Sequence, residues 1–242
     1  MTDLNERINT LAQWMVQAKY LVVFTGAGIS TESGLPDFRG PDGLWTRQER
    51  GLPPPPRVDW SRVQPNQAHL SIVQLQDIGK LKFLITQNVD NLHLRSGIKP
   101  ELIAEFHGNI AKLRCTSCDN QIDSFPDLLN VHCPICEKGK LVSSVVNFGD
   151  PIPRRAYEDS VHHSGLCDCF VVAGSSLVVH PAATMPKIAY KAGAKLVIIN
   201  RGETPLDRIC HLRFWESTGE VLPLAVAQLK EILKTQSIRP KV

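Results

Sequence analysis

Short apolar runs alternate with segments of helical periodicity along almost the whole chain. The apolar runs have the length of buried strands and are found at 20–25, 81–86, 102–106, 144–148, 169–173 and 195–200. A first helix is expected to begin at Asp3 and to place Leu4, Ile8, Leu11 and Met15 on one face. Further helices are expected at 66–79, 182–192 and 221–234. Strands that alternate with helices form a parallel sheet covered on both faces. The sequence therefore predicts an α/β fold with a Rossmann-like parallel sheet.

Polar segments, most of which contain glycine, follow directly after the expected strands. They are residues 26–39, 87–90, 107, 174–176 and 200–203. In open α/β sheets, ligands bind in the crevice at the carboxyl ends of the strands. We therefore expect these segments to line one common crevice.

Two stretches interrupt the alternation of strands and helices. Residues 40–64 are rich in loop-forming residues, and residues 109–140 contain paired cysteines. We expect both stretches to form a small lobe inserted into the large domain. The large Rossmann-like domain would then consist of residues 1–39, 65–108 and 141–242.

The paired cysteines have the spacing of a zinc ribbon. Cys115-x-x-Cys118 and Cys133-x-x-Cys136 are separated by 14 residues. Two such pairs can bring four thiolates to one tetrahedral Zn²⁺, which leaves no open coordination position and therefore indicates a structural site. The alternative is a pair of disulfides or redox-active thiols, which is uncommon in the cytoplasm.

The composition excludes several classes of protein. A net charge of +3 spread over 242 residues gives no reason to expect direct nucleic-acid binding. No apolar run reaches the ~18–20 residues that a membrane-spanning helix needs. The first seven residues are polar and no apolar signal-peptide core follows them, so we expect a cytoplasmic protein without a membrane partner.

Gly26-Ala27-Gly28 follows the first expected strand and suggests a turn whose backbone N–H groups face a phosphate. The dinucleotide fingerprint of dehydrogenases needs a third glycine at position 31, where this chain has Thr31. It also needs an acidic residue at the end of a second strand, and a proline-rich loop occupies that part of this chain. Hydride transfer with a recyclable nicotinamide is therefore disfavoured.

Several longer motifs closely resemble those of the sirtuin (Sir2) family. They are residues 26–40, 43–45, 86–93, 106–108, the four cysteines, 146–150, 174–177 and Asn200, in the family's order over roughly residues 15–225. The resemblance implies an NAD-dependent protein-lysine deacylase, which transfers the acyl group to ADP-ribose and releases nicotinamide. It also implies NAD⁺ as co-substrate, one structural Zn²⁺ per chain, and acyl-lysine-bearing proteins as partners.

The resemblance assigns a role to each matching position. The phosphates and the adenosine side of NAD⁺ would contact Gly26, Ala27, Gly28, Gly174, Ser175 and Ser176. Asn200 and Glu203 would meet the adenosine ribose, although Glu203 could equally be a solvated turn residue. Phe38 would keep water from the reacting carbon, and Arg39 would support the loop or a phosphate unless it is simply solvated.

The implied catalytic residues are His107 and Asn88. His107 would be the general base that activates a ribose hydroxyl. Asn88 and Ser30 would position the nicotinamide ribose or an ordered water, and Gln87 would contact ribose hydroxyls. Asp90 and Ile29 would lie beside the nicotinamide, and Asp90 would bind its carboxamide. We expect His69 and His93 to be packing residues.

The implied acyl-lysine slot is Val146, Asn147, Phe148 and Gly149, an extended edge that could pair with the substrate backbone. Asn147 and Asp150 depart from the family's usual residues, which puts the substrate preference in doubt. The Tyr-x-x-Arg pair of sirtuins that remove succinyl or malonyl groups is absent, although Arg47, Arg50 and Arg57 are conceivable anion partners. We therefore expect uncharged acyl groups.

Two other functions remain open. The first is protein mono-ADP-ribosylation on the same fold, in which His107 would matter less. The second is a non-catalytic zinc-ribbon module that binds nucleic acid or protein; the complete nucleotide loop and His107 argue against it.

Overall fold

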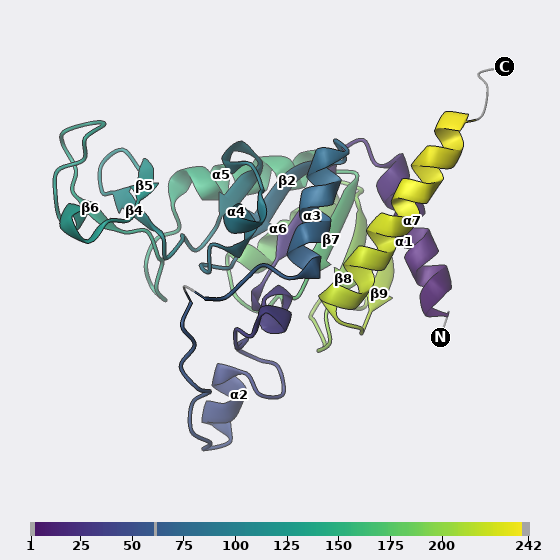
Figure 1. The fold of residues 1–242 in the computed structure, drawn as a ribbon, viewed down its shortest axis with the longest axis horizontal. Helices are drawn as coiled ribbons and strands as arrows, with labels where there is room; N and C mark the ends of the chain where they lie inside the picture. Colours follow the sequence, from purple (N-terminus) through teal and green to yellow (C-terminus); the bar gives the residue numbers. More distant parts are fainter. Residues whose placement is uncertain (1–2, 61, 239–242) are drawn as a thin grey trace.

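A six-stranded parallel sheet forms the centre of the molecule (Figure 1). The computed structural model describes residues 3–60 and 62–238; residues 1–2, 61 and 239–242 of the expected domain division lie outside the described residues. The strand order is β3-β2-β1-β7-β8-β9. The strands are β1 (Leu21–Thr25), β2 (Leu81–Thr86), β3 (Ile103–Glu105), β7 (Cys169–Ala173), β8 (Lys195–Ile199) and β9 (Leu212–Phe214). The predicted parallel sheet is therefore confirmed.

Helices cover both faces of this sheet. One face packs against α1 (Leu4–Gln17), α3 (Gln67–Asp77) and α7 (Thr218–Ile238), and the other against α5 (Arg154–Leu166) and α6 (Met185–Lys191). In β1, Leu21 and Val23 belong to the first core, whereas Val22 and Phe24 belong to the second. Because both faces are buried, the strands are continuous apolar runs without polar alternation.

A second, smaller sheet lies outside these layers, at the left of Figure 1. It is antiparallel, in the order β5-β4-β6, and consists of β4 (Lys112–Cys115), β5 (Gln121–Asp123) and β6 (Leu141–Ser143). Its small core contains Leu113, Leu141 and the cysteines. The helix α2 (Leu44–Glu49) also projects from the main layers, at the bottom of the same view.

The remaining elements are short. They are α4 (Leu92–Ser96) and the 3₁₀ turns η1 (Ala27–Ile29), η2 (Thr31–Ser33), η3 (Pro100–Leu102), η4 (Pro126–Leu128) and η5 (Ala182–Thr184). Among the described residues, no helix combines the length and the apolar composition needed to cross a bilayer.

The expected strand at 144–148 is wrong. The strand of this region is β6, which ends at Ser143 and belongs to the small sheet. Ser144 instead exchanges hydrogen bonds with Asn109, and the Val146 N–H donates to the His107 carbonyl at 2.9 Å. These contacts tie the segment to the chain around His107 rather than to a neighbouring strand.

The apolar pattern of the sequence does not predict α2, α4, α5 or β9. The 13-residue α5 is the largest omission. It contains few large apolar residues and buries two serines, Ser160 and Ser164. A helix of this kind has only a weak apolar stripe, so periodicity does not reveal it.

Candidate nucleotide site and metal centre

The turn after β1 packs directly against the end of β7. The Gly28 N–H donates to the Gly174 carbonyl at 2.8 Å, and the Gly174 N–H donates to the Ile199 carbonyl at 2.8 Å. A Cβ atom at Gly26 or Gly28 would lie only 2.8 Å from backbone atoms of Gly174. Gly174 itself has a φ of +69°, in the left-handed region that favours glycine. The carboxyl ends of β1, β7 and β8 therefore meet through backbone contacts that larger residues would prevent.

Ser30, Asn88 and Asp90 form a hydrogen-bonded cluster beside this turn. The Ser30 hydroxyl donates to Asp90 Oδ2 at 2.6 Å, and the Asn88 amide donates to the same oxygen at 3.2 Å and to Ser30 Oγ at 3.1 Å. The other Asp90 oxygen accepts the Leu92 N–H at 2.9 Å, which fixes the carboxylate at the start of α4. Ser30 and Asp90 are buried, so the structure brings these three predicted residues together in a defined orientation.

A buried polar network lies under this cluster. Thr25 Oγ1 donates to Thr86 Oγ1 at 2.8 Å and lies 2.9 Å from His93 Nε2. His69, whose ring centre is 4.8 Å from that of His93, completes a capping box with Asn66 at the start of α3. Burial lowers the pKa of His69 to about 4 and the pKa of His93 well below 6.5, so both imidazoles are neutral at pH 7.

His69 and His93 are thus buried, as expected of packing residues, but they also make specific polar contacts. The spacing of Asn66 and His69, three residues apart at a helix start, is the signal that could have revealed the contact between these two residues.

His107 follows β3 and faces the end of β2. Its Nδ1 atom lies 3.1 Å from the Gln87 carbonyl oxygen. Because a carbonyl only accepts, Nδ1 carries the proton, and Nε2 is left as the basic nitrogen. Burial lowers the pKa of His107, and the hydrogen bond to the Gln87 carbonyl partly opposes this effect. The Gln87 side chain donates to Ser175 Oγ at 2.7 Å and so joins this region to the end of β7.

Trp45 joins two other aromatic side chains into a row. The Trp45 ring is 4.9 Å from the ring of Phe38 and 5.6 Å from that of Phe148. The Arg39 guanidinium lies over the same indole, 4.6 Å from its centre. The structure thus links the predicted cover residue Phe38 to the predicted slot residue Phe148 through Trp45, to which the sequence analysis gave no role.

The segment that contains the predicted acyl-lysine slot is exposed from Asn147 onward, but it forms a turn at residues 147–150 instead of continuing as the expected extended edge. Phe148 is 78% exposed, and the Asn147 backbone and side-chain amides both donate to Asp150 Oδ2. Gly149 has a φ of +92° and closes this turn. The Val146 N–H already donates to the His107 carbonyl, so the segment is fixed to the backbone of His107.

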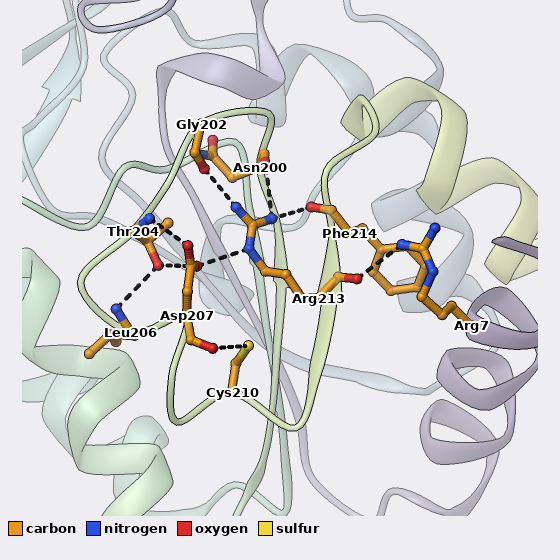
Figure 2. Close-up of polar contacts among 9 residues, drawn as sticks. All are labelled: Arg7, Asn200, Gly202, Thr204, Leu206, Asp207, Cys210, Arg213 and Phe214. Atoms are coloured by element: carbon orange, nitrogen blue, oxygen red, sulfur yellow. Dashed lines mark hydrogen bonds and ion pairs between the residues drawn. The ribbon is translucent and has the colours of Figure 1, made fainter. Parts of the chain in front are cut away.

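Asn200 and Glu203 lie at the end of β8. The Asn200 side chain donates to the Gly202 carbonyl at 2.8 Å, and Glu203 is exposed. Ser176 is half-buried, between the buried residues Ser175 and Leu177. The backbone of Asn200 and Gly202 is fixed by hydrogen bonds from Arg213, a residue that the sequence patterns do not single out (Figure 2).

The four cysteines of the small sheet converge on one point. Their sulfur atoms all lie within 4.8 Å of one another, and the Cys115–Cys136 and Cys118–Cys133 sulfur distances are 3.6 and 3.8 Å. Four thiolates at ~2.3 Å from a tetrahedral ion lie ~3.8 Å apart, whereas disulfide sulfurs lie ~2.05 Å apart. All four are free thiols in the structure, which contradicts the disulfide alternative.

Backbone N–H groups surround these sulfur atoms. Cys115 Sγ accepts from Ser117 and Cys118, and Cys133 Sγ accepts from Ile135. The backbone amides of Gly139 and Lys138 lower the pKa of Cys136 to about 6. The donor set and its hydrogen bonds fit a Zn²⁺ ion held by Cys115, Cys118, Cys133 and Cys136. Cys167 and Cys169, by contrast, are buried thiols whose pKa burial raises to about 12.

Comparison with known proteins agrees with this geometry. Residues 26–57 and 56–181 match the Sir2 family. The NAD-dependent protein deacylase 2 of Archaeoglobus fulgidus is 39% identical over 251 residues, covering 95% of this chain and 98% of the relative.

Two solved structures have the same fold. A Sir2 homologue mutant in complex with ADP-ribose has a TM-score of 0.76 at 35% identity, covering 95% of this chain and 98% of that chain. A Sir2 variant with a deacetylated p53 peptide and 3′-O-acetyl-ADP-ribose has a TM-score of 0.74 at 30% identity, covering 91% and 98%. Since the family match spans more than half of the chain and the relative is matched over almost its full length, the chain belongs to the Sir2 family, the sirtuins.

Proposed function

We propose that the chain is an NAD-dependent protein-lysine deacylase that transfers the acyl group to ADP-ribose and releases nicotinamide. Its substrates are acyl-lysine-bearing proteins. The observation that carries the proposal is the convergence of His107, the Ser30–Asn88–Asp90 cluster and the glycine turn at the ends of adjacent parallel strands. In a Sir2-family chain, these groups are the parts that NAD⁺ cleavage and acyl transfer require.

The glycine turn fits a bound dinucleotide. NAD⁺ supplies an ADP-ribosyl group with nicotinamide as its leaving group. Gly26, Gly28 and Gly174 allow the turn after β1 to pack tightly on the end of β7, because a Cβ atom at any of them would lie less than 3 Å from neighbouring backbone atoms. Together with Ala27, these residues would form the surface that contacts the phosphates. Ser175 and Ser176 add hydroxyl groups beside this turn, and Asn200 and Glu203 would bind the adenosine ribose.

The Ser30–Asn88–Asp90 cluster suits the nicotinamide side. Asp90 is held by three donors, so its carboxylate has a fixed direction toward a carboxamide placed near Ile29. Asn88 and Ser30 lie close enough to each other to position the nicotinamide ribose or a water molecule together. Gln87, the residue before Asn88, would bind ribose hydroxyls. Asn88 therefore has a catalytic role in this proposal.

His107 suits the task of a general base. Its Nδ1 proton is held by the Gln87 carbonyl, so Nε2 can take a proton from a ribose hydroxyl. Phe38 would close the site against water, and Arg39 would support its loop or a phosphate. Val146, Asn147, Phe148 and Gly149 would hold the acyl-lysine segment next to His107. Water exclusion matters because hydrolysis would divert the reaction.

The domain division is part of the proposal. Residues 40–64 and 109–140 would form the small lobe with its zinc ribbon, and β6 (Leu141–Ser143) extends this lobe by three residues because it pairs with β4. The rest of the chain would form the NAD-binding domain. A cytoplasmic location is proposed because seven unpaired cysteines suit a reducing compartment. The small net charge gives no support to direct nucleic-acid binding.

Asp90→Asn is expected to weaken nicotinamide cleavage. The substitution removes the carboxylate charge to which the Ser30 hydroxyl and the Asn88 amide both donate. The side chains of Ser30 and Asn88 then lose the acceptor that orients them. We expect a rate loss of about 10²-fold or more in nicotinamide exchange, which needs only the first bond cleavage. Labelled nicotinamide incorporated into NAD⁺ measures it. Exchange at the wild-type rate would remove Asp90 from the nicotinamide site.

Acetyl-lysine peptides are expected to be better substrates than succinyl-lysine peptides. The chain has no Tyr-x-x-Arg pair, and its tyrosines are Tyr20, Tyr157 and Tyr190. The kcat/KM values on one peptide backbone with the two acyl groups measure the preference. The reverse ranking would show that Arg47, Arg50 or Arg57 binds the acyl carboxylate.

Protein mono-ADP-ribosylation on the same fold is the alternative activity. The experiment that separates the two measures nicotinamide release with NAD⁺ and either an acetyl-lysine peptide or its unmodified form. Deacylation requires release that depends on the acetyl group. Release that is equal for both peptides, with ADP-ribose attached to protein, favours the alternative, and no release at all favours a non-catalytic module.

A further inference from the structure

The loop after β8 is fixed by a single arginine from the neighbouring strand. Arg213 lies on β9, paired with Ile198 of β8, and its side chain crosses to residues 200–202 (Figure 2). Nη1 donates to the carbonyls of Asn200, at 2.7 Å, and of Phe214, while Nη2 donates to the Gly202 carbonyl at 2.6 Å. One guanidinium therefore binds the backbone on both sides of Arg201, at the start of the loop that carries the proposed ribose contacts.

The guanidinium is itself held in place on two sides. Its Nε donates to Asp207 Oδ1 at 2.9 Å, and its plane lies 3.7 Å from the centre of the Trp215 ring. Asp207 is oriented in turn by the Thr204 backbone N–H at 2.9 Å and by the Thr204 hydroxyl at 2.7 Å. Arg213 thus contacts the loop at Asn200, Gly202 and Asp207, and Asp207 in turn contacts Thr204.

These contacts leave Arg213 unsuited to bind a ligand itself. A guanidinium has five N–H donors, and here Nε, Nη1 and Nη2 make four hydrogen bonds within the protein. Its charge is paired with Asp207, and only 12% of its side chain is exposed. The arrangement orders the backbone rather than presenting a cation to a phosphate.

We propose that Arg213 is a positioning residue that fixes residues 200–203 for the adenosine half of NAD⁺. The inference rests on the proposed function, because that function gives Asn200 and Glu203 their ligand. Arg201, Gly202 and Glu203 are exposed and belong to no helix or strand, so the Arg213 contacts provide the order of this segment. A loop that is ordered before binding loses less conformational freedom when the ligand binds.

Binding of ADP-ribose by calorimetry tests the inference. Arg213→Met keeps apolar contact with Trp215 but loses every donor, and Arg213→Lys keeps the charge but cannot reach several carbonyls at once. Both variants should raise the Kd for ADP-ribose by about tenfold or more. In turnover assays, KM for NAD⁺ should rise while kcat at saturating NAD⁺ stays near the wild-type value, a division that a general loss of stability would not produce.

Arg7→Met is the matched control. Arg7 donates to the Arg213 carbonyl and pairs with Glu216 at 2.7 Å, but it acts on the opposite side of β9 from the loop (Figure 2). Its loss should leave the Kd for ADP-ribose near the wild-type value. Asp207→Asn is a second, milder variant, for use if the Arg213 variants do not fold, and it should raise the Kd in the same direction.

The outcomes separate this inference from the proposed function. If the wild-type chain does not bind ADP-ribose, both fail. If the wild-type chain binds and the folded Arg213 variants bind equally well, the proposed function stands and Arg213 has only a structural role. If the Arg213 variants do not fold and Asp207→Asn binds with the wild-type Kd, the inference is likewise overturned.

Discussion

His107→Ala should slow deacylation by about 10²–10⁴-fold while the affinity for NAD⁺ changes little. This is the usual loss when a positioned general base is removed. The imidazole acts after both substrates are bound, because its task is to take a proton from a ribose hydroxyl. Nicotinamide exchange, which precedes that step, should therefore survive the substitution better than product formation does.

His162→Ala is the control for this prediction, because His162 is an exposed histidine of α5. The pH profile provides a second test. Burial lowers the pKa of His107 from its ordinary value of 6.5, so the basic form persists below that pH. The rate should fall only as the pH drops through the lowered pKa. Deacylation by His107→Ala at the wild-type rate would show that the base is another group, and the ADP-ribosyltransferase alternative would gain support.

Cys133→Ser should lose the bound zinc and the yield of folded protein together. Cys133 is buried in the core of the small sheet. This core is small, so the bound ion would supply much of the stability of the lobe. Binding of structural zinc can contribute ~10 kcal/mol or more to folding. Elemental analysis should find one zinc per wild-type chain and a large loss in the variant.

Cys210→Ser is the control for the metal site, because Cys210 lies in the loop before β9, outside the four-cysteine cluster. It should retain the metal. Folded, active wild-type protein that contains no zinc would contradict the assignment of the four cysteines.

The central sheet and the metal cluster could be predicted from the sequence for physical reasons. Strands buried on both faces must be continuous apolar runs, as 169–173 is, and the helices between them keep a 3.6-residue period. Two CxxC pairs restrict four thiolates to one small volume, and the structure brings their sulfur atoms together there. Both signals are local, so no knowledge of the tertiary structure is needed.

Other features depend on contacts between distant residues and leave no local pattern. The expected strand at 144–148 is absent because Ser144 and Val146 bind Asn109 and His107 instead of a neighbouring strand. The contact of Trp45 with Phe148 joins residues 103 positions apart. Arg213 has the same character, since its partners lie up to 13 residues away in the loop after β8.

The products formed from NAD⁺ and an acetyl-lysine peptide test the central claim most directly. Mass spectrometry of the reaction should find nicotinamide, free lysine peptide and O-acetyl-ADP-ribose in equal amounts, because the acyl group passes to ADP-ribose rather than to water. Free acetate formed without consumption of NAD⁺, or ADP-ribose attached to protein with the acetyl-lysine intact, would contradict the proposal that this chain is an NAD-dependent deacylase.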